Sequence, residues 1–181
     1  MAKNRKWYIL FMMIFIVLIS SLMLFLPIKT VLVMYDGKTK QVYGYAKLDQ
    51  STSFQIHYTH SIHLSTVIEM YQITRDKAIL QTETAYRDFG IGMPNNALED
   101  GEEFVVEDGV FKIKNMKRRF EKIDLRIGQI RAQHKLFVGK QNVFLAEIAG
   151  AGTWVTFIPE TYTYWQLWRG VDVFEKHTRN D

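Results

Sequence analysis

Residues 54–59 read Phe-Gln-Ile-His-Tyr-Thr, an alternation of apolar and polar side chains with a period of two. Successive side chains of a β-strand point to opposite faces of the sheet, so Phe54, Ile56 and Tyr58 share one face and the polar residues take the other. The pattern predicts a strand with one face on a core and one face toward solvent. Helical spacing of apolar residues is scarce in the chain around it.

Short segments of the same kind lie on both sides of this strand, separated by turn residues. Asp36-Gly37 and Asp108-Gly109 are strong hairpin signals, because these residue types tolerate the backbone angles of tight turns. We expect about eight to ten strands and a mainly β domain, an antiparallel β sandwich or distorted barrel rather than βαβ units. Eleven segments are the candidates for these strands, namely 31–35, 41–48, 54–59, 67–73, 78–84, 104–106, 111–113, 123–127, 136–138, 143–145 and 154–158.

An apolar segment without charged residues, 7–27, precedes the predicted strands. A helix of this length spans roughly 30 Å, the thickness of a bilayer's hydrocarbon core. The segment ends in large apolar residues rather than in the small residues of a cleavage site, so we expect an uncleaved signal anchor. Residues 1–6 are basic and contain no acidic residue, which predicts that the N-terminus lies in the cytoplasm.

The chain therefore divides into four predicted parts, placed in the cytoplasmic membrane as a single-pass protein with its C-terminal domain outside. The C-terminal part gathers Tyr162, Tyr164, Trp165 and Trp168, aromatic residues that could close a core, stack on carbohydrate, or contact a partner or the membrane. The parts are a cytoplasmic basic stub (1–6), the transmembrane signal anchor (7–27), an extracytoplasmic β domain (28–158) and an aromatic-rich C-terminal extension (159–181).

The basicity of the chain belongs to its first thirty residues. The chain has 23 Lys and Arg against 19 Asp and Glu, and four of the basic residues lie in residues 1–30, which contain no acidic residue. Residues 31–181 are therefore neutral, with 19 basic and 19 acidic residues, and we expect no nucleic-acid partner. Because there is no cysteine, disulfides, thiolate nucleophiles and Cys-ligated metals are excluded.

The densest group of polar residues is 57–63, His-Tyr-Thr-His-Ser-Ile-His, followed by Glu69. A metal site is one interpretation, but in a continuing strand His60 faces away from the other two histidines, and no metal-specific spacing is present. A second interpretation makes Ser61 a nucleophile, with His60 or His63 as base and Glu69 as the acid that orients it. Adjacent strand side chains diverge, however, and no nucleophile elbow is present. The simplest interpretation pairs His60 with Glu69 across a turn near residues 64–65. We predict no metal, no cofactor and no catalytic residue.

A long loop, residues 87–101, departs from the rhythm of the strands. Its segment with Gly90, Gly92 and Pro94 is too short for a dinucleotide fingerprint, and no helix pattern follows to present a phosphate-binding end. The acidic residues after it lack the order of a calcium loop. Irregular loops on rigid scaffolds often carry binding residues, which makes this loop a candidate.

Several of these features together resemble the domain of unknown function 1850 family. The resemblance covers residues 31–158 and rests on Tyr58-Thr59-His60-Ser61 followed by Glu69, on Gly90-x-Gly92-x-Pro94, and on a late His134-x-Leu136. Members of that family are small exported or membrane-anchored proteins, commonly encoded beside permeases of tripartite ATP-independent periplasmic (TRAP) transporters with TAXI-type binding proteins. The resemblance implies candidate ligand-binding or partner-binding residues at Tyr58, His60, Ser61, Glu69, Gly90, Gly92 and Pro94.

We therefore predict a non-enzymatic, membrane-anchored extracytoplasmic accessory protein of a TRAP/TAXI-type solute transporter. Its expected partners are the lipid bilayer, through residues 7–27, and the permease or its solute-binding protein. The alternative is a stand-alone ligand-binding or cell-envelope interaction domain. A serine hydrolase that uses Ser61 is a weaker alternative.

Overall fold

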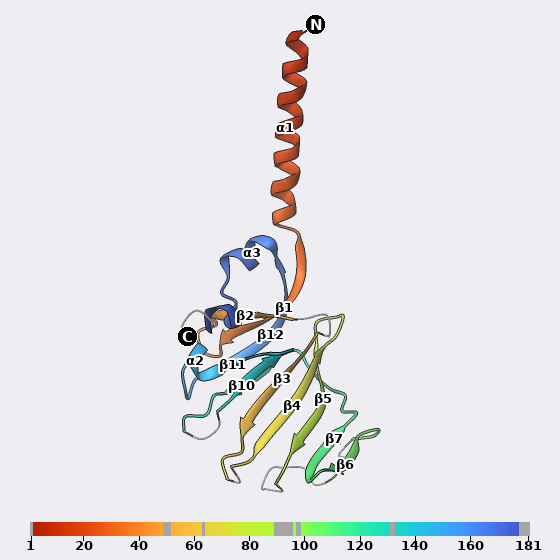
Figure 1. The fold of residues 1–181 in the computed structure, drawn as a ribbon, viewed down its shortest axis with the longest axis vertical. Coiled ribbons are helices and arrows are strands. Elements are labelled where there is room, and N and C mark those ends of the chain that lie inside the picture. The colour runs from red at the N-terminus through yellow and green to blue at the C-terminus, as the bar shows by residue number, and fades with distance from the viewer. Residues whose placement is uncertain are drawn as a thin grey trace.

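In the computed structural model, a long N-terminal helix stands on a mainly β domain (Figure 1). The structure describes residues 2–48, 52–62, 64–88, 96, 99–130 and 133–177. Helix α1 spans Ala2–Leu24, and the rest of the protein buries none of its segment Trp7–Leu24. A helix that is apolar on every face and uncovered has the length and composition of a membrane span or signal anchor. It ends three residues before the predicted end at Pro27.

Two antiparallel sheets form the domain, which confirms the predicted mainly β fold. Sheet A has the strand order β2 (Val42–Lys47), β1 (Pro27–Asp36), β12 (Trp154–Thr163) and β9 (Ile123–Arg126). Sheet B has the order β11 (Gln141–Phe144), β10 (Lys135–Val138), β3 (Ser53–Thr59), β4 (Thr66–Ile73), β5 (Ile79–Tyr86), β7 (Val110–Lys114) and β6 (Glu103–Glu107), and β8 (Arg118–Phe120) also pairs with β5. The short helices are α2 (Leu145–Ala149), α3 (Tyr164–Arg169) and α4 (Val173–His177).

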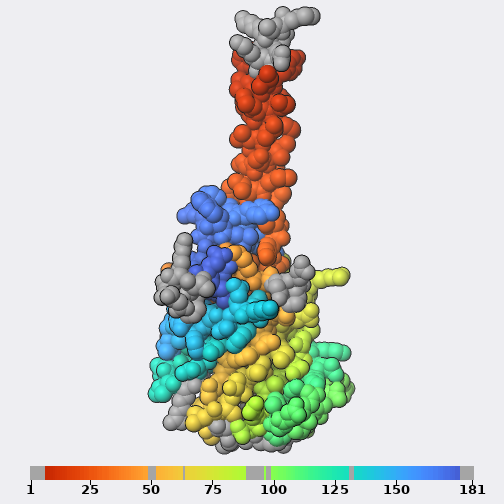
Figure 2. Space-filling view, viewed as in Figure 1, coloured from red at the N-terminus to blue at the C-terminus, as the bar shows by residue number. Residues whose placement is uncertain are grey.

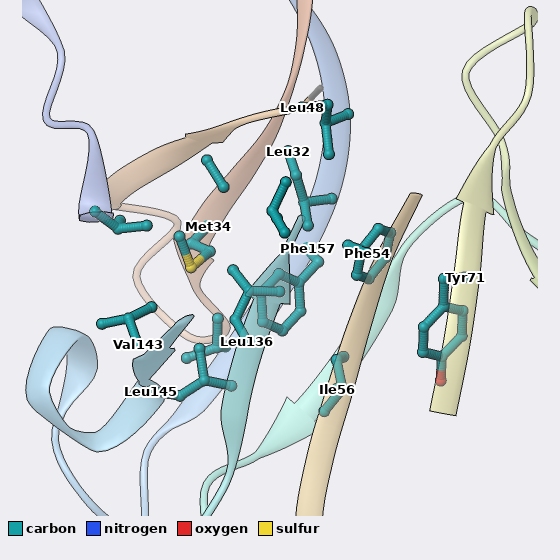
Figure 3. Close-up of a cluster of buried hydrophobic side chains, with 14 of the residues drawn as sticks. Leu32, Met34, Leu48, Phe54, Ile56, Tyr71, Leu136, Val143, Leu145 and Phe157 are labelled. Atoms are coloured by element: carbon teal, nitrogen blue, oxygen red, sulfur yellow. The ribbon is translucent and has the colours of Figure 1, made fainter. Parts of the chain in front are cut away.

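The main core lies between the two sheets (Figure 3). Leu32 and Phe157 reach it from sheet A, and Phe54, Ile56 and Leu136 reach it from sheet B, all at most 1% exposed. The alternation of residues 54–59 thus has the predicted result, since Phe54 and Ile56 are fully buried while Gln55 and His57 are only partly buried on the other face.

Both predicted Asp-Gly hairpins are present. Asp108 and Gly109 have φ angles of 52° and 74° and form the two-residue loop between β6 and β7. Positive φ at both positions is the signature of a type I′ turn, which suits the twist of two antiparallel strands. In the β1–β2 hairpin, the Asp36 carboxylate accepts hydrogen bonds from the backbone N–H groups of Lys38 and Thr39 at 2.8 and 2.7 Å. These bonds hold the turn closed.

The sequence predicts a strand that ends at residue 158, but β12 continues through Pro159 to Thr163. Pro159 pairs with Leu32 of β1, and pairing with β9 on the other side stops at Phe157. Proline is tolerated at such a position, because its missing N–H then faces no neighbouring strand. The predicted boundary between the β domain and the extension 159–181 therefore falls inside a strand of sheet A.

The chain after β12 folds back onto sheet A. The Tyr45 hydroxyl donates to the Leu167 carbonyl at 2.7 Å, and the Tyr45 backbone N–H donates to the Val171 carbonyl at 2.9 Å. Farther along, Phe174 is 4% exposed and belongs to the main core. The described part of the C-terminal segment is thus an integral layer of the domain.

Candidate functional site

A group of polar side chains lies on the inner face of sheet B, beside the apolar core. Glu69 and Tyr71 are two residues apart on β4 and therefore share this face, and the Tyr71 hydroxyl donates to Glu69 Oε2 at 2.8 Å. Glu69 pairs across the sheet with Ile56, so Tyr58 comes next to it on the same face. The Glu69 carboxyl group therefore lies between Tyr58 and Tyr71.

Burial dominates the electrostatics of this group. It raises the pKa of the Glu69 carboxyl, and the hydrogen bond from Tyr71 offsets part of that effect. Burial, together with the nearby Glu69 charge, raises the pKa of the Tyr58 hydroxyl to about 12. Glu69 therefore keeps its proton to a higher pH than an exposed glutamate, while the tyrosines remain neutral.

His134 extends the polar group toward the surface. It is 7% exposed, and its ring stacks on Tyr58 with ring centroids 5.3 Å apart. The backbone N–H of Gly128 donates to His134 Nδ1 at 3.3 Å, a bond that requires an unprotonated Nδ1 and so places the proton of the neutral ring on Nε2. The backbone carbonyl of His134 also accepts from the N–H of Leu145 at 2.9 Å, which joins this loop to α2.

Strand β5 adds two buried polar residues through an irregularity in its pairing. Gln81 Nε2 donates to Thr84 Oγ1 at 2.9 Å, and both side chains are 7% exposed. Residues three apart on a regular strand face opposite ways. Here Tyr71 pairs with Gln81 while Met70 pairs with Glu83, so one extra residue in β5 keeps Gln81 and Thr84 on the inner face.

A cavity of about 320 Å³ opens beside this group. His134 forms part of its wall, with Gln129, Gln133, Phe144 and Glu147. This volume lies at the lower end of the range for sites that take small organic molecules. A polar row runs from the cavity to the interior through His134, Tyr58 and Glu69. We call these three residues the inner polar row.

The structure brings some of the predicted site residues together and separates others. Tyr58 and Glu69 lie in the inner polar row, whereas His60 and Ser61 lie in the turn between β3 and β4, where Ser61 is exposed. The expected pairing of His60 with Glu69 is wrong, because the backbone N–H of His60 donates to the Ser65 carbonyl at 2.8 Å and Glu69 lies opposite Ile56. The turn is centred before Leu64, about two residues earlier than assumed.

The remaining predicted residues, Gly90, Gly92 and Pro94, lie outside the described residues. Ser61 lines neither the cavity beside His134 nor a second cavity of about 440 Å³ between the β3–β4 turn and the end of β5. Within the described ranges, no three His, Asp or Glu side chains lie together in a way that could hold a metal ion.

Sequence reasoning did not select Tyr71, Gln81, Thr84 or His134 as site residues. A signal existed for Tyr71, which stands two residues after Glu69 and so on the same strand face. His134 was part of the family resemblance without an assigned role. Gln81 and Thr84 gave no local signal, because the extra residue in β5 that aligns them appears only in the paired sheet.

The comparisons with known proteins identify a family. The family model described as Domain of unknown function (DUF1850) matches residues 54–145, just over half of the chain, from β3 through β11. This stretch contains sheet B and the inner polar row, whereas α1, β1, β2 and β12 lie outside it. No curated protein and no solved structure shows significant similarity to the chain. Because the match covers more than half of its residues, the chain belongs to the DUF1850 family, a domain of unknown function.

Proposed function

We propose that this protein is a non-enzymatic, membrane-anchored extracytoplasmic accessory of a solute transporter of the TRAP/TAXI type. The observation that carries the proposal is the junction between helix and domain. Helix α1 ends at Leu24 and β1 begins at Pro27, so only Phe25 and Leu26 separate a membrane-span helix from the first strand of sheet A. Two residues reach at most about 7 Å when extended.

This short connection limits where the domain can work. A stalk of many flexible residues would let a domain sample a wide volume above the membrane, whereas this junction holds sheet A within a few ångströms of the end of α1. Partners at that height are other membrane proteins and molecules delivered to them. The class of transporter comes from the resemblance described above, which the DUF1850 family match supports.

The inner polar row fits an accessory better than a catalyst. Its carboxyl group, Glu69, is partly buried and hydrogen-bonded to Tyr71, and its three residues include no serine, threonine or cysteine. The exposed position of Ser61 in a turn, outside both cavities, gives no support to the hydrolase alternative.

Co-purification in mild detergent tests the proposal. The full chain, carrying an affinity tag at its C-terminus, is purified from membranes of its own source beside two variants. One variant has α1 replaced by an unrelated membrane-spanning helix ending at the same position, and the other has a cleavable signal peptide in place of α1. We expect a transporter permease or its solute-binding protein to be retained with the full chain and with the helix-replacement variant. The signal-peptide variant should retain less of it. The proposal fails if neither component is retained with the intact chain.

A second candidate function is supported by the cavity beside His134. Its volume of about 320 Å³ and its wall, which is mostly apolar but includes amide, imidazole and carboxylate groups, fit a small molecule with both apolar and polar parts. In this role the domain would bind a ligand by itself. Native mass spectrometry of the purified chain separates the two candidates, because a retained small molecule that is lost in a Gln133→Leu variant, without any transporter component, favours the ligand-binding domain.

A further inference from the structure

Helix α3 lies at the place where α1 meets the domain (Figure 1), and it carries exposed aromatic side chains. No residue of α3 is buried, and Trp168 is 75% exposed, more than any other described tryptophan of the outer domain. Figure 2 shows α3 in blue against the lower end of α1. Large aromatic residues exposed in this way usually mark an interaction surface.

This surface is firmly built. The Gln166 backbone N–H donates to Thr163 Oγ1 at 3.1 Å, and the Thr163 N–H donates to Gln166 Oε1 at 2.9 Å, which together form a capping box. The Leu167 carbonyl is held by the Tyr45 hydroxyl at 2.7 Å. Helix α3 is therefore fixed to sheet A with its aromatic rings outward.

The aromatic surface is continuous with the membrane-span helix. The rings of Phe25 and Trp165 lie 6.1 Å apart, and those of Trp165 and Trp168 lie 5.2 Å apart. Phe25 is the first residue after α1, so this row of rings starts where the span ends. We call Phe25, Tyr164, Trp165 and Trp168 the juxtamembrane patch.

A cation of α3 accompanies the patch. The Arg169 guanidinium lies 5.6 Å from the centre of the Trp165 ring, and among the described residues no carboxylate forms an ion pair with it. Guanidinium groups bind phosphate through paired hydrogen bonds. Tryptophan and tyrosine gather at the headgroup level of bilayers, where one end of the ring is apolar and the other is wet.

We propose that α3 lies in the headgroup region of the outer leaflet, with Trp165 and Trp168 in contact with lipid and Arg169 bound to lipid phosphate. The inference rests on the proposed anchoring of α1 in that bilayer and adds a second attachment point. A lone helix would let the domain rotate and tilt about its axis. Attachment through α1 and α3 together fixes which face of the β sandwich is turned toward neighbouring membrane proteins.

Single-tryptophan variants of the full chain test this placement in vesicles of phosphatidylcholine and phosphatidylglycerol. The chain has four tryptophans, and substituting Trp7, Trp154 and Trp165 by Phe leaves Trp168 as the reporter. The matched control keeps Trp154, which is 42% exposed and stands at the opposite end of β12, roughly 30 Å from α3. Lipids with brominated acyl chains quench tryptophan only at short range.

We expect brominated lipid to quench Trp168 at least several-fold more than Trp154, and acrylamide in the water to quench Trp154 more. We also expect brominated lipid to quench Trp168 more in vesicles that contain phosphatidylglycerol than in phosphatidylcholine alone. An Arg169→Gln variant should lose this difference. Equal acrylamide quenching of the two tryptophans, with no effect of brominated lipid on Trp168, would overturn the inference and leave the patch as a docking site for a protein.

A third variant that retains only Trp7 separates this inference from the proposed anchoring. If Trp7 is quenched by brominated lipid and Trp168 is not, α1 is inserted and only the placement of α3 is wrong. If neither is quenched, the anchoring itself is wrong and the inference falls with it. Quenching of both supports both.

Discussion

The environment of Glu69 differs from that of a surface carboxylate. It lies on the inner face of sheet B, accepts a hydrogen bond from Tyr71 at 2.8 Å and stands beside Tyr58. Burial disfavours its charged form and raises its pKa, so the folded protein binds its proton more tightly than the unfolded chain does. Glu69 should therefore lower the stability of the fold once it is ionised.

A Glu69→Gln variant tests this account. Because the folded pKa is raised above the unfolded value, near 4.5, the free energy of unfolding of the natural chain should fall as pH rises from the unfolded to the folded pKa, and stay lower above it. The amide still accepts from Tyr71 but does not titrate. We expect the stability of the variant relative to the natural chain to increase across that window, measured by thermal unfolding in detergent at several pH values.

The control for this experiment is Glu121→Gln, which removes an exposed carboxylate outside the sandwich. Its stability difference from the natural chain should change little over the same pH range. A stability difference for Glu69→Gln that is flat with pH, or that shrinks as pH rises, would contradict the raised pKa.

The hydroxyl of Tyr71 should matter more than that of Tyr58. A Tyr71→Phe substitution leaves the Glu69 carboxyl without its hydroxyl donor and should cost about 1–3 kcal/mol of unfolding free energy. The cost should be larger at neutral pH, where Glu69 carries more charge. Tyr58→Phe keeps the ring stacked on His134 and removes no hydrogen bond to another described residue, so we expect a smaller loss. Equal losses in denaturant titrations would contradict this ranking.

At the scale of elements, the sequence predicted the turns and strand faces that depend only on neighbouring residues along the chain. Asp108-Gly109 forms the expected two-residue turn because positive φ at both positions is a property of those two residues. Phe54 and Ile56 lie in the core as their alternation predicts, because the period of two is also a local property of a strand. These features needed no knowledge of the rest of the chain.

Features that depend on a neighbouring strand were missed. Proline usually ends a strand, but Pro159 continues β12 because β9 has already ended beside Phe157. The pairing of Glu69 was misplaced because the centre of the β3–β4 turn decides register, and residues 60–65 contain no strong two-residue turn signal. Two of the three residues of the inner polar row, Tyr58 and Glu69, were therefore visible in the sequence, while the role of His134 depended on the fold.

The contact between sheet A and the C-terminal segment can be tested at Gly44 of β2. A methyl group added there would lie 2.7 Å from the Val171 carbonyl oxygen and 2.8 Å from Val173 Cγ1. Gly44→Ala should therefore push the segment off the sheet and cost about 1–3 kcal/mol, as overpacking does in other cores. We expect a lower melting temperature and faster proteolysis after residue 163. Val42→Ala on the same strand, where the side chain is 48% exposed, should change both by little.

At the scale of the molecule, the family match and the proposed membrane attachment occupy different regions. The matched residues 54–145 contain sheet B and the inner polar row. Helix α1, most of sheet A and α3 lie outside this stretch and connect the domain to the proposed membrane surface. In the proposed arrangement, sheet A lies between the region that matches the family and the membrane surface, and the two-residue junction after α1 limits the distance between them.

Lengthening that junction should separate folding from function. A flexible Gly-Ser linker of about ten residues between Leu26 and Pro27 would add roughly 15–20 Å of average reach while leaving the pairs from Lys29 to Asp36 with β12 in place. We expect an unchanged melting temperature, loss of the Phe25–Trp165 contact and reduced retention of the transporter component. A chain cut after Pro27 should likewise fold and fail to retain that component. Full retention by either the linker variant or the cut domain would show that close attachment to the membrane is not part of the function.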